Sequence, residues 1–294
     1  MFCSAIGYCA WAIDILFNYF VHVTNLLFST HHVKHYFKLF HPLTFPKLFL
    51  AILAPLAIVL VFGQRIQSPM RTKNKHNGYV LNEDEFRVII ATGFNTKSKN
   101  AKTGDMIQIW ILVKAENPVA AIKSGLDHLI CGHCPHRGHS GGVDRACYVQ
   151  VGHAPLAIYR AWRRGKYPTL TDVNVFTGRA VRFGAYGDPC HIPISLIESI
   201  TNVANGWTGY THQWRRHSGL KRFFQASVDN LQELSIARLN GWGTFRLGSP
   251  QPTETECANS RTGISCRDCQ ACNGTLFSIS IDPHGIGKKH VSLN

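Results

Sequence analysis

Residues 180–203 read AVRFGAYGDPCHIPISLIESITNV and contain one strand, one turn and one helix in succession. The apolar start, 180–183, predicts a short strand that leads into the turn GAYGDP at 184–189. Beyond the turn, apolar residues recur every third position from Ile194 to Val203, which is the spacing of an amphipathic helix. A strand joined to a helix by a short polar turn is typical of the repeating unit of α/β proteins.

The same alternation continues on both sides of this unit. Short loops separate the predicted elements, which indicates a βα-repeat with a parallel sheet. We expect an α/β fold that forms a partial or full TIM-barrel-like arrangement, with an open doubly wound sheet as the alternative. The predicted strands are 86–91, 106–114, 180–183, 207–214, 223–228 and 243–247, and the predicted helices are 119–124, 154–165, 194–203 and 231–239.

Polar residues follow several of these strands, where ligands bind in folds of this kind. Gly184 and Gly187 would let backbone amides approach a ligand, and Asp188 could bind an amino group or a ribose hydroxyl. His212 lies near the end of one later predicted strand and Asp229 follows another, and we predict catalytic roles for them. An ordinary βα turn and solvated strand ends are the alternative interpretation of these residues.

Cys131, Cys134 and Cys147 form a first cysteine group in a loop rich in glycine and histidine. The C-x2-C spacing places two thiolates on one metal or cluster, and glycine and proline keep the loop irregular so that the sulfurs can converge. Three cysteines without an obvious fourth leave one coordination position open, as in reactive zinc or iron sites. A structural zinc loop completed by a histidine of the same loop is the alternative.

Cys257, Cys266, Cys269 and Cys272 form a second cysteine group near the C-terminus. Two successive C-x2-C steps with a fourth cysteine nearby can close a four-thiolate site, which suits either a [4Fe–4S] cluster or zinc. Because the protein fills all four positions, we expect this site to stabilise the fold or to supply electrons. A structural zinc knuckle is the alternative.

The distribution of cysteine and charge indicates the compartment and the kind of partner. Seven of the 10 cysteines lie in the two groups, whereas disulfide-linked secreted proteins spread cysteines through a short chain. This distribution favours reduced thiolates in the cytoplasm. The chain carries 31 Lys and Arg against 17 Asp and Glu, a net charge of +14. Such an excess favours a polyanionic partner such as nucleic acid or a nucleotide.

Residues 1–69 differ in composition from residues 70–294, so we place a boundary at Met70. The first segment contains only one of the 17 acidic and four of the 31 basic residues. Its apolar run at 48–63, even when extended to 44–63, is close to the lower limit for a membrane span. The segment is either an extension upstream of the working protein or a membrane anchor that leaves the α/β metal-binding domain in the cytoplasm.

The stretch from about 97 to 284 resembles a group of phage- and prophage-encoded cysteine-rich proteins. The resemblance is carried by KTGDMIQ at 102–108, by the loop with Cys131, Cys134 and Cys147-Tyr148, by the turn at 184–189, by GYTHQW at 209–214, by ASVD at 226–229 and by the closing cysteines. More distantly, the order of these parts is similar to that of radical S-adenosylmethionine (SAM) enzymes, particularly phage relatives of photoproduct-lyase-like proteins.

The second resemblance implies a cofactor and a reaction. Cys131, Cys134 and Cys147 would ligate a [4Fe–4S] cluster whose fourth iron binds SAM, and the turn residues Gly184, Gly187 and Asp188 would contact the methionyl or ribose part. An electron from the cluster would cleave SAM, and the resulting adenosyl radical would take hydrogen from a substrate. The usual spacing in these enzymes is C-x3-C-x2-C, whereas this chain has C-x2-C-x12-C.

The leading hypothesis is therefore an iron–sulfur protein of the radical SAM type that acts on a nucleotide or nucleic acid. Two hypotheses from other classes stay open. One is a zinc-stabilised nucleic-acid-binding module without catalysis. The other is a metal-dependent hydrolase that uses His133, His136 or His139 in an open metal site.

Overall fold

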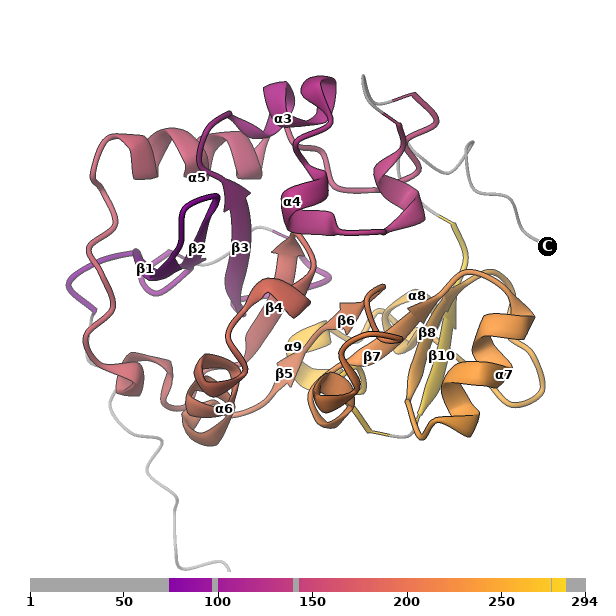
Figure 1. The fold of residues 1–294 in the computed structure, drawn as a ribbon. Coiled ribbons are helices and arrows are strands. Elements are labelled where there is room, and N and C mark those ends of the chain that lie inside the picture. Colours follow the sequence, from indigo (N-terminus) through magenta and orange to yellow (C-terminus); the bar gives the residue numbers. More distant parts are fainter. Residues whose placement is uncertain (1–73, 97–99, 140–142, 276, 284–294) are drawn as a thin grey trace, which may run out of the picture. The chain divides into compact units, whose positions relative to one another are not determined.

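The computed structural model describes residues 74–96, 100–139, 143–275 and 277–283, all of which belong to one unit, Pro69–Asn294 (Figure 1). The predicted extension or membrane anchor at 44–63 lies outside these described residues. Within the described ranges, no helix is both long enough and apolar enough to cross a membrane.

The described strands form two sheets, with the orders β1-β2-β3-β4-β5 and β6-β7-β8-β10-β9. The first sheet contains β1 (Gly78–Glu83), β2 (Arg87–Thr92), β3 (Ile107–Val113), β4 (Val181–Tyr186) and β5 (Trp207–Thr208). The second contains β6 (Tyr210–Thr211), β7 (Gln225–Val228), β8 (Thr244–Leu247), β9 (Thr255–Glu256) and β10 (Ser278–Ile281).

The kind of strand pairing changes once along the chain, from antiparallel to parallel. β1, β2 and β3 pair antiparallel, because a helix is absent from the described residues that connect them and parallel neighbours need a crossover. From β3 onward every pair is parallel: β3 with β4, β4 with β5, and all pairs of the second sheet. The predicted mixed α/β architecture with parallel strands is confirmed, with an antiparallel beginning that the sequence pattern did not indicate.

Gly209 divides the strand that we predicted at 207–214 into β5 and β6. A Cβ at Gly209 would lie only 2.6 Å from Cδ1 of Phe224, so the close approach of this ring requires glycine. Gln225 of β7 donates a backbone hydrogen bond to Gly209 O at 3.1 Å. Since β5 pairs with β4 and β6 pairs with β7, the divided segment belongs to both sheets.

Helices follow the strands as the pattern predicts, and their ends carry the expected caps. Asn117 accepts backbone hydrogen bonds at the start of α3, and Gly125 ends that helix with a φ of 82°. Asn230 caps α7 in the same way through Glu233 N at 2.8 Å. The helices are α3 (Pro118–Ser124), α4 (His128–Cys131), α5 (Ala154–Arg163), α6 (Ile194–Val203), α7 (Leu231–Leu239), α8 (Ala258–Thr262) and α9 (Cys266–Cys269).

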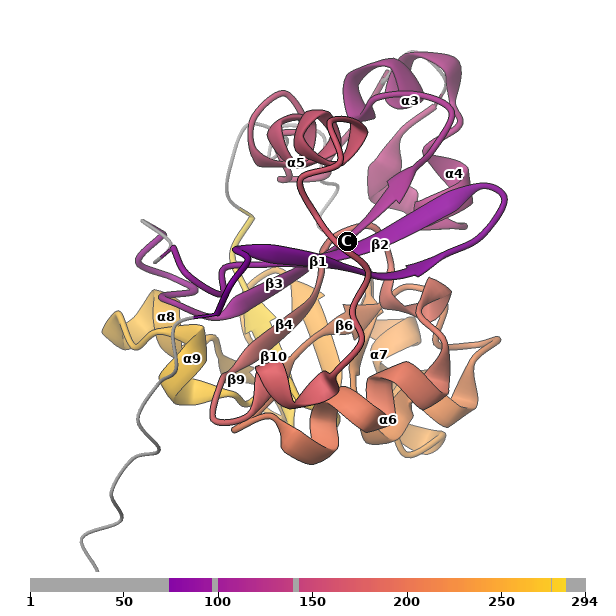
Figure 2. The same ribbon diagram turned by 90° about the vertical axis from the view of Figure 1, so that its left-hand side faces the viewer.

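The core lies along β2, β3 and β4, whose apolar side chains are almost all buried. α5 and α6 lie on opposite sides of the first sheet (Figure 2), so both faces of its central strands are covered. That covering explains the nearly continuous apolar run of β3, because a strand buried on both faces has no polar side. The ring pairs Phe94–Phe176 and Phe183–Phe224, with centroids 5.2 and 5.3 Å apart, fill the space between the layers.

Candidate functional site

A pocket of about 120 Å³ lies where the carboxyl ends of β4, β6, β7 and β8 meet the loop that follows α4. Figure 1 shows β4 pointing toward α4. Cys131, Cys134 and Cys147 line the pocket from the loop side, and Gly184, Asp188 and His212 line it from the strand ends. This is the edge at which α/β folds bind their ligands. The first cysteine group and the glycine turn, distant in sequence, therefore share one site.

Backbone hydrogen bonds bring the three cysteines of the first group to this pocket. Cys131 is the last residue of α4, and the next turn is closed by a bond from Cys134 N to Cys131 O at 3.2 Å. After a single turn of 3₁₀ helix, Cys147 N donates to His136 O at 2.8 Å. The bond from Cys147 N to His136 O brings Cys147 back toward Cys131 and Cys134, although 12 residues separate Cys134 from Cys147.

An ion pair fixes the base of the cysteine loop. Arg137 Nη2 donates to Asp127 Oδ1 at 2.8 Å and to Gly125 O at 2.9 Å. Burial raises the pKa of Asp127, although the adjacent Arg137 opposes that shift. At Gly138, with a φ of +76°, a Cβ would lie 2.5 Å from Val143 O. The loop thus crosses itself closely at a position that only glycine fits.

The thiols of this group lie in surroundings that disfavour free thiolates. Burial raises the pKa of Cys131 well above its ordinary value, and the neighbouring Cys134 thiol adds to the shift. Burial also raises the pKa of Cys147, against the opposing charge of Arg145. A bound metal or cluster supplies positive charge and displaces thiol protons. Three soft donors in a partly closed pocket therefore fit such a group.

His136, His212 and Asp229 meet beside the same pocket. Asp229 Oδ1 lies 2.8 Å from His136 Nε2 and 3.5 Å from His212 Nε2. Burial alone would raise the pKa of Asp229, but the hydrogen bond from His136 and the adjacent His212 ring hold it well below its ordinary value. Burial alone would lower the pKa of His212, but the facing Cys134 and Asp229 raise it well above its ordinary value. The three side chains form a compact cluster.

Asp188 connects the elements around the pocket. Its carboxylate accepts hydrogen bonds from Thr211 Oγ1 at 2.6 Å, from His212 N at 2.8 Å and from Cys190 N at 2.9 Å. Its backbone N–H donates to Ile130 O, one residue before the first cysteine, at 2.7 Å. Asp188 therefore positions the end of β6 and the end of α4 relative to β4. Its predicted contact with a cofactor stays a prediction.

The two glycines of the turn are required by the protein itself. Gly184 has a φ of +70°, and a Cβ there would lie 2.9 Å from Gly187 O. Gly187 has a φ of +81°, and a Cβ there would lie 2.8 Å from Cβ of Ile111 in β3. The left-handed backbone and the close contacts both exclude other residues. Both glycines line the pocket, so their predicted approach to a ligand stays a prediction.

Aromatic rings form another wall of the pocket. Tyr210 and Phe245 stack with centroids 4.6 Å apart and planes inclined by 6°. The Tyr210 hydroxyl is 2.7 Å from the Tyr148 hydroxyl, which also accepts a hydrogen bond from Arg182. A flat aromatic pair at a pocket edge offers a surface on which a planar ring can stack.

The second cysteine group surrounds a separate pocket of about 180 Å³. Cys257, Cys266, Cys269 and Cys272 all line it. Burial raises the pKa of Cys272, and the nearby thiols of Cys266, Cys257 and Cys269 add to the shift, which reflects their mutual proximity. The four thiols are therefore gathered around one space, as their spacing predicts for a four-thiolate site.

Backbone hydrogen bonds attach this group to three parts of the fold. Cys266 N donates to Lys102 O at 2.7 Å, and Cys257 N donates to Ser280 O in β10 at 2.8 Å. Cys272 O accepts from Gly209 N at 2.8 Å. These contacts place the group against the 102–105 loop, the last strand and the junction of β5 with β6.

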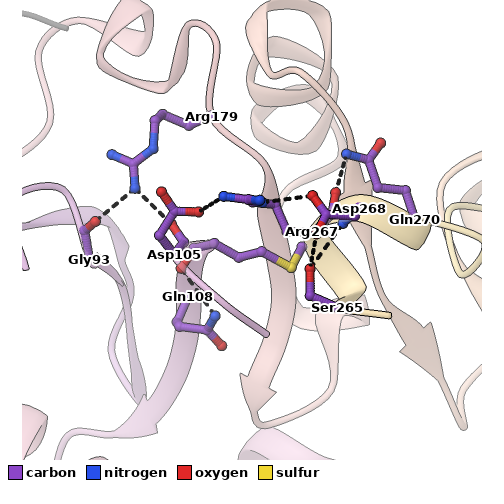
Figure 3. Close-up of polar contacts among 9 residues, drawn as sticks. Gly93, Asp105, Gln108, Arg179, Ser265, Arg267, Asp268 and Gln270 are labelled. Atoms are coloured by element: carbon purple, nitrogen blue, oxygen red, sulfur yellow. Dashed lines mark hydrogen bonds and ion pairs between the residues drawn. The ribbon is translucent and has the colours of Figure 1, made fainter. Parts of the chain in front are cut away.

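A side-chain network reinforces the attachment to the 102–105 loop (Figure 3). Figure 3 shows Arg267 between two carboxylates, with Nη1 3.1 Å from Asp105 Oδ1 and Nε 2.9 Å from Asp268 Oδ1. Arg179 donates to Asp105 O at 2.8 Å and to Gly93 O at 2.9 Å. The network connects the end of β2, the start of β3 and the second cysteine group.

Gln225 holds the segment that follows Cys272. Its side chain is fully buried in β7. The amide nitrogen donates to Ala271 O, Thr275 O and Phe277 O at 3.1 to 3.3 Å, and the amide oxygen accepts from Gly274 N at 2.8 Å. A single buried amide thus satisfies several backbone groups of this segment. Nothing in the spacing of the cysteines indicated this residue.

The histidines proposed for a hydrolytic metal site separate in space. His136 lines the pocket of the first cysteine group. His133 and His139 instead line a neighbouring hollow with Arg137 and Asp144. His136 is therefore the one of the three that joins the predicted catalytic residues His212 and Asp229. Periodicity could not find this convergence, because His136 and Asp229 lie 93 positions apart in the chain.

No protein-family model, curated protein or solved structure matches this chain.

Proposed function

We propose that the protein is an iron–sulfur enzyme of the radical SAM type that acts on a nucleotide or nucleic acid. Cys131, Cys134 and Cys147 would hold a [4Fe–4S] cluster, and the turn at 184–188 would contact SAM beside it. The proposal rests mainly on one observation: these cysteines and this turn line one pocket at the carboxyl ends of parallel strands. When bound, such a cluster supplies the electron for radical chemistry with SAM.

The spacing of the thiols supports a cluster over a single zinc ion. Around one tetrahedral zinc with Zn–S bonds of about 2.3 Å, sulfurs lie about 3.8 Å apart. Among the described residues, the cysteines form no group of three whose sulfurs all lie within 4.8 Å of one another. In any three cysteines of a group, at least one pair of sulfurs therefore lies farther apart than two ligands of a single zinc ion, which is compatible with the larger size of a cluster.

The residues around the pocket have distinct proposed tasks. The loop partly buries Cys131 and Cys147, and burial raises the pKa of both thiols. Asp188 keeps His212 and the end of β6 in place through its hydrogen bonds. Tyr210 and Phe245, which stack on each other and both line the pocket, would offer aromatic surface to an adenine or nucleobase. The net charge of +14 supports a polyanionic substrate.

We also propose that the parallel strands curve as a partial barrel. Support comes from the segment at Gly209, because β5 continues the first sheet and β6 begins the second. Because this segment joins the two sheets, their parallel strands would place their carboxyl ends around one site, as the strands of a barrel do. The second cysteine group would stabilise the end of this row or supply electrons. Reduced thiols in both groups fit a cytoplasmic protein.

Anaerobic preparation of the full chain tests the proposal. We expect a brown protein that contains iron and acid-labile sulfide, binds SAM and, with a reductant, converts SAM to 5′-deoxyadenosine. Cys134→Ala should lose SAM cleavage and part of the iron. Cys190→Ala is the matched control, because Cys190 belongs to neither group, and it should retain both.

Two results would contradict the proposal in different ways. Zinc with no iron in a colourless protein would favour the zinc-stabilised nucleic-acid-binding module. Iron and sulfide without any SAM binding would retain the iron–sulfur protein but exclude the radical mechanism.

A further inference from the structure

Two imidazoles and one carboxylate converge at a single point next to the pocket of the first cysteine group. Donor atoms of His136, His212 and Asp229 all lie within 4.8 Å of one another, and no other group of three His, Cys, Asp or Glu residues in the described part of the chain meets this limit. We infer that these three residues form a binding site for one divalent transition-metal ion, distinct from the two cysteine groups.

The distances between the donor atoms agree with ligands around one ion. Metal–nitrogen and metal–oxygen bonds of about 2.0–2.1 Å separate ligands by about 3.3 Å in tetrahedral and about 2.9 Å in octahedral geometry. Asp229 Oδ1 lies 2.8 Å from His136 Nε2 and 3.5 Å from His212 Nε2. The two observed separations fall on either side of these values, so an ion could enter with small side-chain movements.

The burial of His212 adds an independent observation. Its Nε2 atom is buried and makes no full hydrogen bond, with the Asp229 carboxylate 3.5 Å away as an ion-pair partner, and incomplete hydrogen bonding is costly for a buried ring nitrogen. The side chains of His212, His136 and Asp229 are only 14%, 17% and 26% exposed. A metal ion at the point of convergence would satisfy this buried nitrogen and neutralise the carboxylate.

Each of the three residues is held by its own element. Cys147 N donates to His136 O at 2.8 Å, and His212 N donates to Asp188 Oδ2 at 2.8 Å. Asp229 N donates to Glu233 Oε2 at 2.9 Å, at the capped start of α7. These bonds fix the backbone of the three residues. The fold therefore holds their side chains near one another before an ion binds.

The donor set defines the class of ion and its chemistry. Two histidines and one carboxylate suit Zn²⁺ or Fe²⁺ and leave further coordination positions open. His136 and His212 both line the pocket, so an ion there would sit at its edge and could bind an oxygen atom of a ligand as a Lewis acid. This inference does not depend on the cluster proposed for the first cysteine group.

Binding of Co²⁺ to the full chain tests the site. The protein is purified anaerobically, so that its cysteine groups keep the metal they hold, and is then titrated with Co²⁺ alone. We expect one equivalent to bind and to produce visible absorption bands of nitrogen and oxygen coordination. His136→Ala and the nearly isosteric Asp229→Asn should each weaken binding, with loss of a ligand costing at least about 100-fold. His139→Ala, in the same loop but outside the cluster, is the matched control and should bind as the wild type does.

The outcomes separate this inference from the proposed function. Absence of Co²⁺ binding, or equal binding by wild type, His136→Ala and Asp229→Asn, would overturn the inference. A thiolate-to-cobalt absorption band that persists in His136→Ala would overturn it too, because the ion would then sit on cysteine. If Cys131→Ser loses iron but still binds one equivalent of Co²⁺, the metal site stands by itself. Iron content measured in the same samples reports on the cluster alone.

Discussion

The buried ion pair between Arg246 and Glu254 holds the chain that leads to the second cysteine group. Arg246 projects from β8 with its side chain 6% exposed, and the Glu254 side chain is 0% exposed. The guanidinium contacts both carboxylate oxygens, with Nε 3.0 Å from Oε1 and Nη2 2.5 Å from Oε2. Glu254 also accepts a hydrogen bond from Gln251 N at 3.0 Å, and Cys257 follows three residues later.

Glu254→Ala should be strongly destabilising because it leaves the Arg246 charge buried without a partner. Removing one member of such a pair costs about 3–5 kcal/mol of unfolding free energy. For a domain of this size, each kcal/mol lowers the melting temperature by about 2–4 °C, so the expected decrease is about 6–20 °C. We expect the lower half of this range, since Arg246 keeps its hydrogen bonds to Leu247 O and Ser249 O at 3.2 and 2.7 Å.

Thermal and urea unfolding of the full chain provide the assay, and an exposed ion pair provides the control. In the pair between Arg222 and Glu198 the side chains are 58% and 40% exposed. Glu198→Ala should therefore cost no more than about 1 kcal/mol. A double variant, Arg246→Met with Glu254→Leu, should recover much of the stability that Glu254→Ala loses. The reasoning is wrong if Glu254→Ala and Glu198→Ala unfold at the same temperature.

Three further predictions concern the two cysteine groups and their supports. Cys134→Ala should abolish SAM binding with little change in melting temperature. Cys269→Ala should instead lower the melting temperature, because a closed four-thiolate site stabilises folding. The reverse pattern would mean that the two cysteine groups have the opposite roles. Gly187→Ala should lower the free energy of unfolding in urea by about 2–4 kcal/mol, because a left-handed backbone penalty is added to overpacking against Ile111. A decrease below about 1 kcal/mol would contradict the close contact. Gln225→Ala should leave buried backbone groups without partners and lower the free energy of unfolding by about 1–3 kcal/mol. Metal analysis of this variant should show a lower metal content at the second group. Unchanged metal content would contradict the proposed role of Gln225.

The sequence alone predicted several local units of this protein. Within 180–203 the predicted helix appears as α6, and the predicted strand appears as β4, which continues to Tyr186 through the first half of the predicted turn. Apolar periodicity and glycine record the burial and backbone angles of a short segment. The second cysteine group was assigned to one site because two residues separate Cys266 from Cys269 and Cys269 from Cys272, with Cys257 nearby. Such a short spacing restricts how far apart the sulfurs can lie.

Segments distant along the chain were beyond the reach of such patterns. The division of the predicted strand 207–214 depends on the Phe224 ring, which approaches Gly209 too closely for any other residue. The antiparallel pairing of β1 with β2 depends on which neighbour each strand meets rather than on its own composition. Periodicity reports that a side chain is buried, but it does not report the residue that covers it.

The candidate site shows the same division between sequence and tertiary structure. The sequence named His212, Asp229 and the cysteines of the first group separately, each from its position after a strand or within a loop. Only the fold placed His136 2.8 Å from Asp229 and brought the cysteine loop against the end of β4 through the bond from Asp188 N to Ile130 O. The physical reason is that parallel strands bring their carboxyl ends to one edge, so residues separated by scores of positions meet there once the sheet has formed.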